Sequence, residues 1–370
     1  MSATKGLEGI VATTSSISSI VDGVLTYRGI DIDDLAENAT FEEVIYLLWF
    51  GKLPTQTELE KLQSDLNAYS KVPDAVINQI KAFPKDVNSM AALRTAVSAL
   101  ALYDEEANDL SPESNVRKAI KLQAQIPGII AAFARIREGK EPLASPGYAS
   151  VAANFLYQLT GNEPDKIAIE ALDKALVLHA DHELNASTFA ARVTVATLTD
   201  IYSGITSAIG TLKGPLHGGA NEAVMAMLEE IGTVENVVPY INDKLERKDK
   251  IMGFGHRVYK NGDPRAKHLQ KMSYELGKLT GNLKWYEMSI KADELVTSLK
   301  GLKPNVDFYS ASVYTTLEIP RDLFTPIFAI SRTSGWAAHI LEQYENNRLI
   351  RPRAEYTGPV NQKYIPISAR

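Results

Sequence analysis

Apolar residues recur at helical spacing along most of the chain, and segments in which apolar and polar residues alternate are scarce. In one such segment, Thr40 and Glu43 are spaced to form a capping box, and Gly51 is placed to end the helix. Thr55 and Glu58 repeat the capping box at the start of the next helix. A chain with this periodicity must build its core by packing helix against helix, so we predict an all-α fold.

The helical pattern continues through residues 88–104 and through a long segment, 111–139, where Pro127 predicts a kink or break. Further helices are expected near residues 148–160, 165–180, 187–208, 219–231, 234–247, 264–279, 285–299 and 321–345. Strand material is expected only near the start of the chain, where Asp22 and Gly23 form a hairpin signal between two short apolar runs. The predicted fold is therefore all-α with a minor N-terminal β element.

Composition narrows the possible functions. The 370 residues suffice for about two domains, and the net charge of −6 carries no basic tract of the kind that binds nucleic acid. The absence of cysteine excludes disulfides and thiolate chemistry, and no apolar run reaches the length of a membrane span. The first residues lack the apolar core of a signal peptide. We therefore expect a cytoplasmic protein with neither nucleic-acid nor membrane partners.

The histidines are the first candidates for chemistry. His179 and His182 lie in the sequence HADHE, which suggests a metal cluster but matches neither order of the known zinc motifs. We expect no bound metal there and interpret His182 as a hydrogen-bonding or ligand-facing residue. By itself, His339 is typical of a satisfied core histidine, and His268 of a solvated helix face.

His217 stands in the sequence GPLHGGANE, directly before a predicted helix. Glycine allows the backbone to approach a ligand closely, so a histidine in such a stretch is placed for presentation to a substrate.

A second glycine-flanked histidine, His256, opens the sequence GFGHRVYKNGDPRAK. A dinucleotide-binding interpretation fails, because the third glycine of that motif and its strand–helix context are missing. A helix start with a cluster of basic residues favours an anion site instead, formed from Arg257, Lys260, Arg265 and Lys267. The alternative is a solvated basic loop.

Asp307 lies among apolar and aromatic residues in the sequence NVDFYSASVY. Burial would raise its pKa and make it a stronger base, although a buried structural carboxylate is the alternative. Arg332 interrupts an otherwise apolar helical segment, which indicates an anionic partner. Arg351 precedes Pro352, which biases it toward an extended backbone in a tail that should reach outward.

Taken together, these segments resemble the citrate synthase family. The resemblance runs from GLEGIVA to RPRAEYTG, and the stretches HADHELNAS, GPLHGGANE, GFGHRVYKNGDPRAK and NVDFYSA follow in the family's order and spacing. It implies a helical homodimer whose subunit has a large domain, residues 1–216 and 321–370, and a small domain, residues 217–320. It also implies an acyltransferase of the tricarboxylic acid cycle that joins acetyl-CoA, as co-substrate, to oxaloacetate without a permanently bound cofactor.

The resemblance also implies residue roles. By motif position, His217 would steady the acetyl-CoA enol, His256 would polarise the oxaloacetate ketone, and Asp307 would be the catalytic base. The residues expected to bind oxaloacetate are His182, Arg265, Arg332 and Arg351, the last contributed across the dimer interface. Arg257 and Lys260 are expected at the CoA phosphates.

Two alternatives accompany this prediction. A 2-methylcitrate synthase would use propionyl-CoA with the same catalytic set, and one methylene changes selectivity by only ~1–3 kcal/mol. A catalytically inactive helical scaffold or ligand sensor would lack one of His217, His256 and Asp307, yet all three are present. The matching motif begins by about Gly6, so we expect the short dimeric type.

Overall fold

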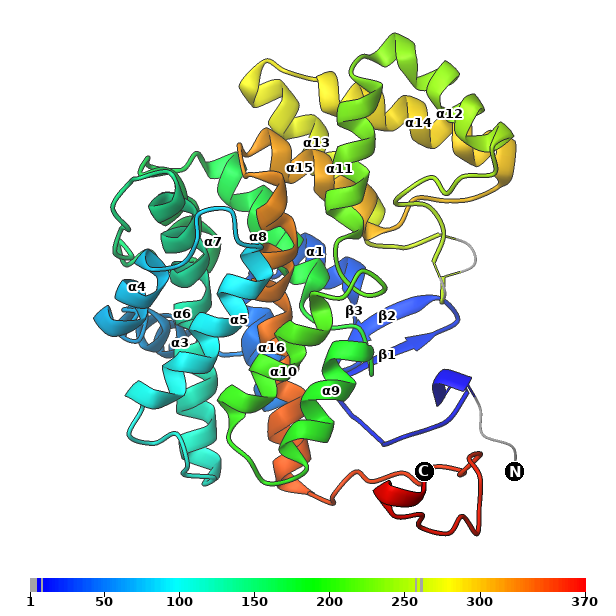
Figure 1. Cartoon of the computed structure of the whole chain (residues 1–370). Helices are drawn as coiled ribbons and strands as arrows, with labels where there is room; N and C mark the ends of the chain where they lie inside the picture. The colour runs from blue at the N-terminus through cyan, green and yellow to red at the C-terminus, as the bar shows by residue number, and fades with distance from the viewer. Residues whose placement is uncertain (1–4, 8, 257, 260–261) are drawn as a thin grey trace.

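The computed structural model describes residues 5–7, 9–256, 258–259 and 262–370, and it confirms a mainly helical fold with a small sheet (Figure 1). The described residues contain sixteen α-helices. Their bounds are Ile32–Asn38 (α1), Phe41–Phe50 (α2), Gln56–Ala68 (α3), Asp74–Lys81 (α4), Ser89–Leu100 (α5), Pro112–Arg137 (α6), Val151–Thr160 (α7), Lys166–His179 (α8), Ala186–Val195 (α9), Ile201–Leu212 (α10), Ala220–Ile231 (α11), Val237–Glu246 (α12), Ala266–Thr280 (α13), Lys284–Lys300 (α14), Val306–Thr316 (α15) and Phe324–Glu345 (α16).

The structure confirms the predicted caps at the ends of the early helices. In α2 the Thr40 side chain accepts a hydrogen bond from the Glu43 amide, and the Glu43 carboxylate accepts one from the Thr40 amide. Thr55 and Glu58 form the same reciprocal cap on α3. Gly51 ends α2 with φ 76°, a left-handed conformation that a residue with a Cβ rarely adopts. These ends are determined by residues a few positions apart, so they were readable from the sequence.

The N-terminal hairpin is also confirmed. Strands β1 (Ser18–Val21) and β2 (Val24–Tyr27) pair antiparallel with Val21 opposite Val24, and β3 (Ile30–Asp31) pairs with β2. Asp22 and Gly23 both have positive φ, 51° and 82°, as a two-residue type I′ turn requires.

Several helical predictions differ from the structure, and α1 and α4 were not among the expected helices. Helix α6 continues through Pro127, so the break that was one of the two expected outcomes is absent; packing against α5, α7 and α16 stabilises the helix despite the missing amide donor. The single helix expected over 187–208 is two helices, α9 and α10, since Leu198 has φ 66° and Asp200 caps the second through the Ser203 amide. Helix α15 was missed because it is buried on nearly all sides and shows no amphipathic stripe.

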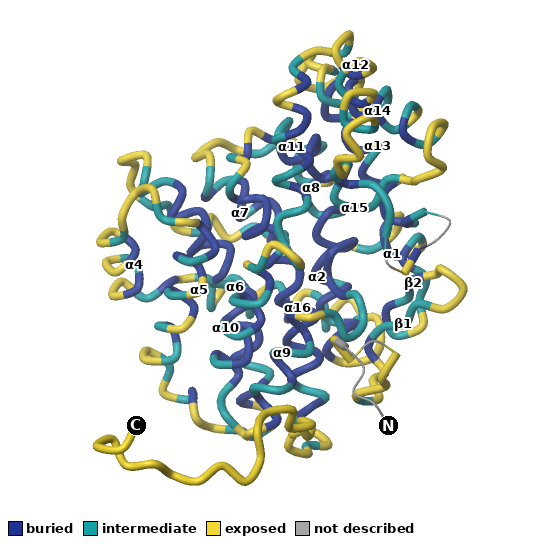
Figure 2. Tube along the Cα trace, turned by 45° about the vertical axis from the view of Figure 1, so that its right-hand side comes forward, coloured by how far each residue is buried: buried dark blue, intermediate teal, exposed yellow. Residues whose placement is uncertain are grey.

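Helix α16 forms the centre of the molecule and contacts α2, α6, α8, α9 and α10 (Figures 1 and 2). Almost all of its residues from Phe324 to Ile340 are buried. Helices α11 to α15 pack mainly on one another, and α13 and α15 also contact α8. The tail over 351–370 is exposed throughout (Figure 2). No helix among the described residues combines the length and hydropathy that a membrane span requires.

Candidate active site

The predicted site residues come from five separate segments of the chain. His182 follows α8, His217 precedes α11, His256 and Arg265 lie in the loop before α13 and at its N-cap, Asp307 opens α15, and Arg332 lies on α16. A short backbone ladder joins two of these segments: the amide of Gly255 donates to Lys303, and that of Asn305 donates to Gly253. Asn305 then caps α15 through the Asp307 amide and donates from Nδ2 to the Gly255 carbonyl, at 2.9 Å. The His256 loop is therefore held beside the helix that carries Asp307.

His182, His256 and Tyr259 form a cluster of rings. The centroids of the two imidazoles are 5.3 Å apart, and the Tyr259 ring lies 4.6 Å from that of His256. The Tyr259 hydroxyl is 3.1 Å from His182 Nε2. Burial, followed by the charges of Arg265 and Arg332, lowers the pKa of His182 well below its ordinary value. His182 is therefore a neutral hydrogen-bonding group in a positively charged environment, as a site for an anionic ligand requires.

Arg265 is buried and held in a bidentate ion pair by Asp263, with N···O distances of 2.9 and 2.8 Å. Burial opposes the ionisation of Asp263, but the charge and hydrogen bonds of Arg265 outweigh it and lower the carboxyl pKa to about 2. Asp263 also accepts from the Val306 amide at 3.0 Å. One carboxylate therefore orients the guanidinium and caps the helix of Asp307.

Arg332 is buried differently. Its Nε donates to the His179 carbonyl at 2.7 Å, and its guanidinium carbon lies 4.6 Å from the centre of the Phe328 ring. No ion pair joins Arg332 to a carboxylate in the part of the chain that the structure describes. Burial lowers its pKa to about 10, although Asp181 acts in the opposite direction. A buried cation of this kind favours an anionic ligand as its partner.

The hydrogen bonds of His217 determine its tautomer. The Ser187 backbone amide, which can only donate, lies 3.3 Å from His217 Nε2, and the Ser187 hydroxyl lies 2.7 Å from the same atom. Nε2 is therefore an acceptor, and the ring proton is on Nδ1. Burial, with a further contribution from Arg332, lowers the pKa of His217 to about 4. His217 is a neutral donor near pH 7.

The glycines around His217 are a steric requirement as well. A Cβ on Gly218 would lie 2.2 Å from the Leu212 carbonyl oxygen, and Gly219 has φ 82° at the start of α11. Only glycine permits this return of the chain from α10 into α11.

His256 has the opposite tautomer. Its Nδ1 accepts from the amides of Val258 and Tyr259, at 3.0 and 3.3 Å. The proton of the neutral ring therefore lies on Nε2. The two histidines are thus neutral donors whose orientation is set by backbone amides.

Asp307 lies in the first turn of α15 and is mostly buried. Burial raises its pKa to about 6, with Arg265 lowering it and Asp263 raising it as smaller influences. A carboxyl group with this pKa is ionised at pH 7 and is a stronger base than an exposed aspartate.

Other predicted residues are not brought to this cluster. Arg351 is exposed in the C-terminal tail, and the described residues show no contact between it and His182, Arg265 or Arg332. Arg257 and Lys260 lie outside the described residues. Lys267 pairs with Asp33 rather than with the anion site. The described residues contain no group of three or more side chains suited to hold a metal.

Two predictions for the remaining histidines have different outcomes. His268 was expected on a solvated face, but it is buried and its Nε2 lies 2.7 Å from an Asp33 oxygen. The solvated-face prediction is wrong because α13 packs on α8 and α15, which buries His268 beside the Asp33 side chain of α1. His339 is a satisfied core histidine, as expected, with partners at both ring nitrogens.

Sequence reasoning missed the residues that orient the others, namely Tyr259, Asp263, Ser187 and Asn305. Asp263 and Asn305 carry a recognisable signal, since each is two residues before a functional side chain at a helix start. No local signal marks Ser187, because its contact with His217 depends on how α9 meets the turn before α11.

The chain is similar to known proteins over nearly its whole length. A family model described as "Citrate synthase, C-terminal domain" matches residues 6–353. Citrate synthase 2 of Bacillus subtilis is 66% identical over 371 residues and 100% of both chains. A protein named 2-methylcitrate synthase 1 of Corynebacterium glutamicum is 42% identical over 99% of this chain and 98% of its own. The structure of a citrate synthase from Thermoplasma acidophilum, in ternary complex with carboxymethyl coenzyme A and oxaloacetate, is 37% identical with a TM-score of 0.91, covering 98% of each chain.

Proposed function

The chain belongs to the citrate synthase family and condenses acetyl-CoA with oxaloacetate to give citrate and CoA, and within that reaction we propose that Asp307, His217 and His256 perform the chemistry. The observation that supports the proposal is that His217 and His256 have opposite tautomers set by backbone amides, while burial raises the pKa of the Asp307 carboxyl group. One donor and one base suit the acyl substrate, and the second donor suits a ketone.

The Asp307 carboxylate removes a proton from the acetyl methyl group, while His217 donates from Nδ1 to the thioester oxygen and stabilises the enol. The enol carbon attacks the oxaloacetate ketone carbon, whose oxygen takes a proton that His256 supplies from Nε2. Asp307 then releases its proton, and His256 regains one at Nε2, by exchange with solvent. Water finally cleaves the citryl thioester: its oxygen joins the new carboxylate, one of its protons goes to the CoA thiol, and the other is released to solvent.

Oxaloacetate is proposed to bind through His182, Arg265 and Arg332. Its two carboxylates and ketone match two buried guanidinium groups and a neutral imidazole, and the positive environment that lowers the pKa of His182 supports this assignment. For the CoA phosphates we propose Arg257 and Lys260. The two-domain division at 217 and 320, and a cytoplasmic location, stay predictions from the sequence.

The test of the activity is thiol release from acetyl-CoA with oxaloacetate present, with propionyl-CoA run in parallel. We expect kcat/KM to favour acetyl-CoA by roughly 10–200-fold, the range that one methylene supplies in an apolar pocket. Propionyl-CoA is the necessary comparison because one relative of the chain is named as a 2-methylcitrate synthase. A higher kcat/KM with propionyl-CoA would assign the chain to 2-methylcitrate synthesis instead.

We further propose a homodimer in which Arg351 completes the partner's oxaloacetate site. The exposed tail that follows Arg351 carries large apolar side chains, and Tyr356, Tyr364 and Ile367 are 71%, 80% and 78% exposed. Apolar surface of this kind is typical of an interaction segment. Arg351, lying on the same tail, would add a bidentate carboxylate contact to a neighbour's site.

Mixing two inactive variants tests this arrangement. After subunit exchange between Arg351→Ala and His256→Ala chains, one site of each mixed dimer carries both lesions and the other carries neither. Activity should return to about half of the wild-type value per mixed dimer, because a two-fold axis gives two equivalent sites. Confirmed exchange without any return of activity would mean that Arg351 acts within its own chain.

A further inference from the structure

The segment that carries His182 lies along one face of α16. Residues 332, 335, 336 and 339 recur at helical spacing on this face, and each of them meets the segment over 179–187. Arg332 donates to the His179 carbonyl, and the Trp336 indole donates to the Ser187 hydroxyl at 3.1 Å. At Gly335 a Cβ would lie 2.3 Å from the Ala180 carbonyl oxygen, so the two backbones touch. The last contact is His339 Nε2 to Asp181 Oδ2, at 3.2 Å.

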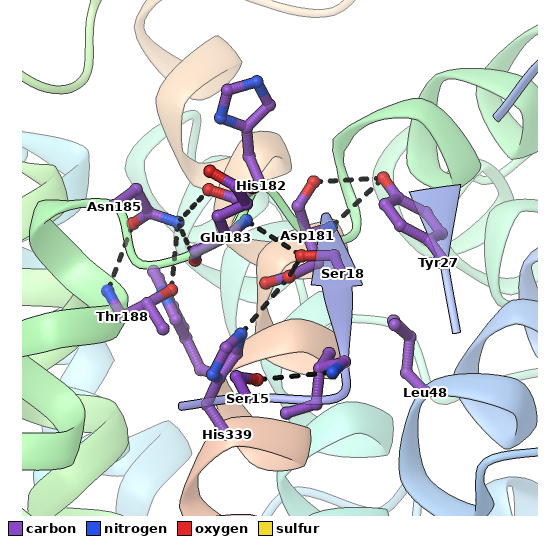
Figure 3. Close-up of polar contacts among 12 residues, drawn as sticks. Ser15, Ser18, Tyr27, Leu48, Asp181, His182, Glu183, Asn185, Thr188 and His339 are labelled. Atoms are coloured by element: carbon purple, nitrogen blue, oxygen red, sulfur yellow. Dashed lines mark hydrogen bonds and ion pairs between the residues drawn. The ribbon is translucent and has the colours of Figure 1, made fainter. Parts of the chain in front are cut away.

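Asp181 and His339 are fully buried, and neither has a part in the reaction steps above. Figure 3 shows Asp181 between His339 and the N-terminal hairpin. On the hairpin side, Ser18 donates to the same carboxylate oxygen that His339 contacts, and the Tyr27 hydroxyl donates to the Asp181 carbonyl. The backbone and side chain of Asp181 are therefore held from two directions.

The tautomer of His339 is determined by a third residue. Arg192 Nη1, which can only donate, lies 3.1 Å from His339 Nδ1 and also pairs with Glu342 at 2.7 Å. The His339 proton is therefore on Nε2, where it is donated to Asp181. The donor that meets Asp181 thus has a fixed direction.

The residue after His182 is held as well. Glu183 accepts from the Ile20 amide at 2.6 Å, donates from its own amide to the Ser18 hydroxyl, and has φ 50°. A left-handed conformation at a non-glycine residue persists only where neighbours enforce it. With both neighbours held, the His182 ring points to the opposite side from His339 (Figure 3), where its Nε2 lies 3.1 Å from the Tyr259 hydroxyl.

We propose that Asp181 and His339 form a positioning pair, which orients His182 toward oxaloacetate by anchoring its turn to α16. The inference rests on the proposed role of His182 in binding that substrate. The pair contributes no atom to the reaction; it fixes the backbone from which the His182 ring extends toward Tyr259. Arg332, also on α16, contacts the same segment at the His179 carbonyl. The pair therefore also fixes the position of His182 relative to this buried arginine.

The test compares two substitutions of His339. Leucine has a similar volume but leaves Asp181 without its helix partner, whereas glutamine can still donate to Asp181 and accept from Arg192. We expect His339→Leu to raise KM for oxaloacetate roughly 10–100-fold, by analogy with the loss of a partner that orients a metal-binding histidine. KM for acetyl-CoA at saturating oxaloacetate should change far less, and His339→Gln should restore most of the oxaloacetate affinity.

Ile340→Ala is the matched control, because Ile340 is buried on α16 and packs toward Gly204 of α10. It should lower the melting temperature and leave KM for oxaloacetate unchanged, since KM does not depend on the folded fraction. If His339→Leu fails to fold, Ser18→Ala removes the other side-chain donor to Asp181 from the hairpin side and should raise the same KM in the same direction.

His182→Ala distinguishes the positioning pair from the proposed role of His182 in binding oxaloacetate. If it raises KM for oxaloacetate while His339→Leu and Ser18→Ala do not, the positioning pair is overturned and the proposed function stands. If His182→Ala leaves that KM unchanged, the role of His182 fails and the positioning pair fails with it. A glutamine variant as defective as the leucine variant would also overturn the pair.

Discussion

Replacing Asp307 by asparagine should slow turnover by roughly 10²–10⁴-fold, the usual contribution of a general base. Asparagine keeps the shape of the side chain at the start of α15, and the Asp307 amide still reaches the Asn305 cap. Oxaloacetate binding, measured by calorimetry, should therefore stay nearly intact while kcat falls. Wild-type activity should also fall as the pH drops through about 6, because the base must be ionised and burial raises its pKa to that value.

The stability of the same variant distinguishes a base from a structural carboxylate. Burial disfavours the charged form, so the folded pKa of about 6 exceeds the ordinary value of 3.8. The contribution of Asp307 to stability is then largest below 3.8 and is lost as the pH rises through about 6. At pH 7.5 the asparagine variant should be at least as stable as the wild type. A variant that unfolds, or that turns over at the wild-type rate, would favour the structural interpretation.

Replacing His217 by alanine should lower kcat by roughly 10²–10³-fold, as for the loss of one oxyanion donor. The substitution removes the Nδ1–H donor. Burial and the charge of Arg332 keep the wild-type ring neutral by lowering its pKa to about 4. A neutral donor does not titrate between pH 5 and 8, so the ratio of variant to wild-type kcat should be constant across that range.

Ser187→Ala provides the matched control for His217. It removes the hydroxyl 2.7 Å from Nε2 but keeps the backbone amide that determines the tautomer. Its kcat should be much closer to the wild-type value than that of His217→Ala. A His217→Ala enzyme within a few-fold of wild-type kcat would remove His217 from the catalytic set.

Helix ends and the hairpin turn were predictable because the residues that determine them are neighbours in sequence. The two threonine–glutamate caps, the glycine after α2 and the Asp22–Gly23 turn all satisfy backbone groups within four residues. The failures at α6, α9–α10 and α15 have the opposite cause. In each case, the helix bounds depend on burial against other helices or on a single residue of positive φ. The spacing of apolar residues in the sequence shows neither of these.

The same distinction between local and tertiary causes applies to the residues of the site. The sequence by itself determined which residue types stand at each motif: two histidines among glycines, an aspartate among aromatic residues, and an arginine in an apolar helix. Only the tertiary structure decided the protonated nitrogen of each ring, the Asp263 that holds Arg265, and the Asp181–His339 contact across 158 residues. The reason is physical: a tautomer or a raised pKa depends on which donors, charges and apolar groups surround a side chain, and in this fold those groups come from distant segments packed around α16.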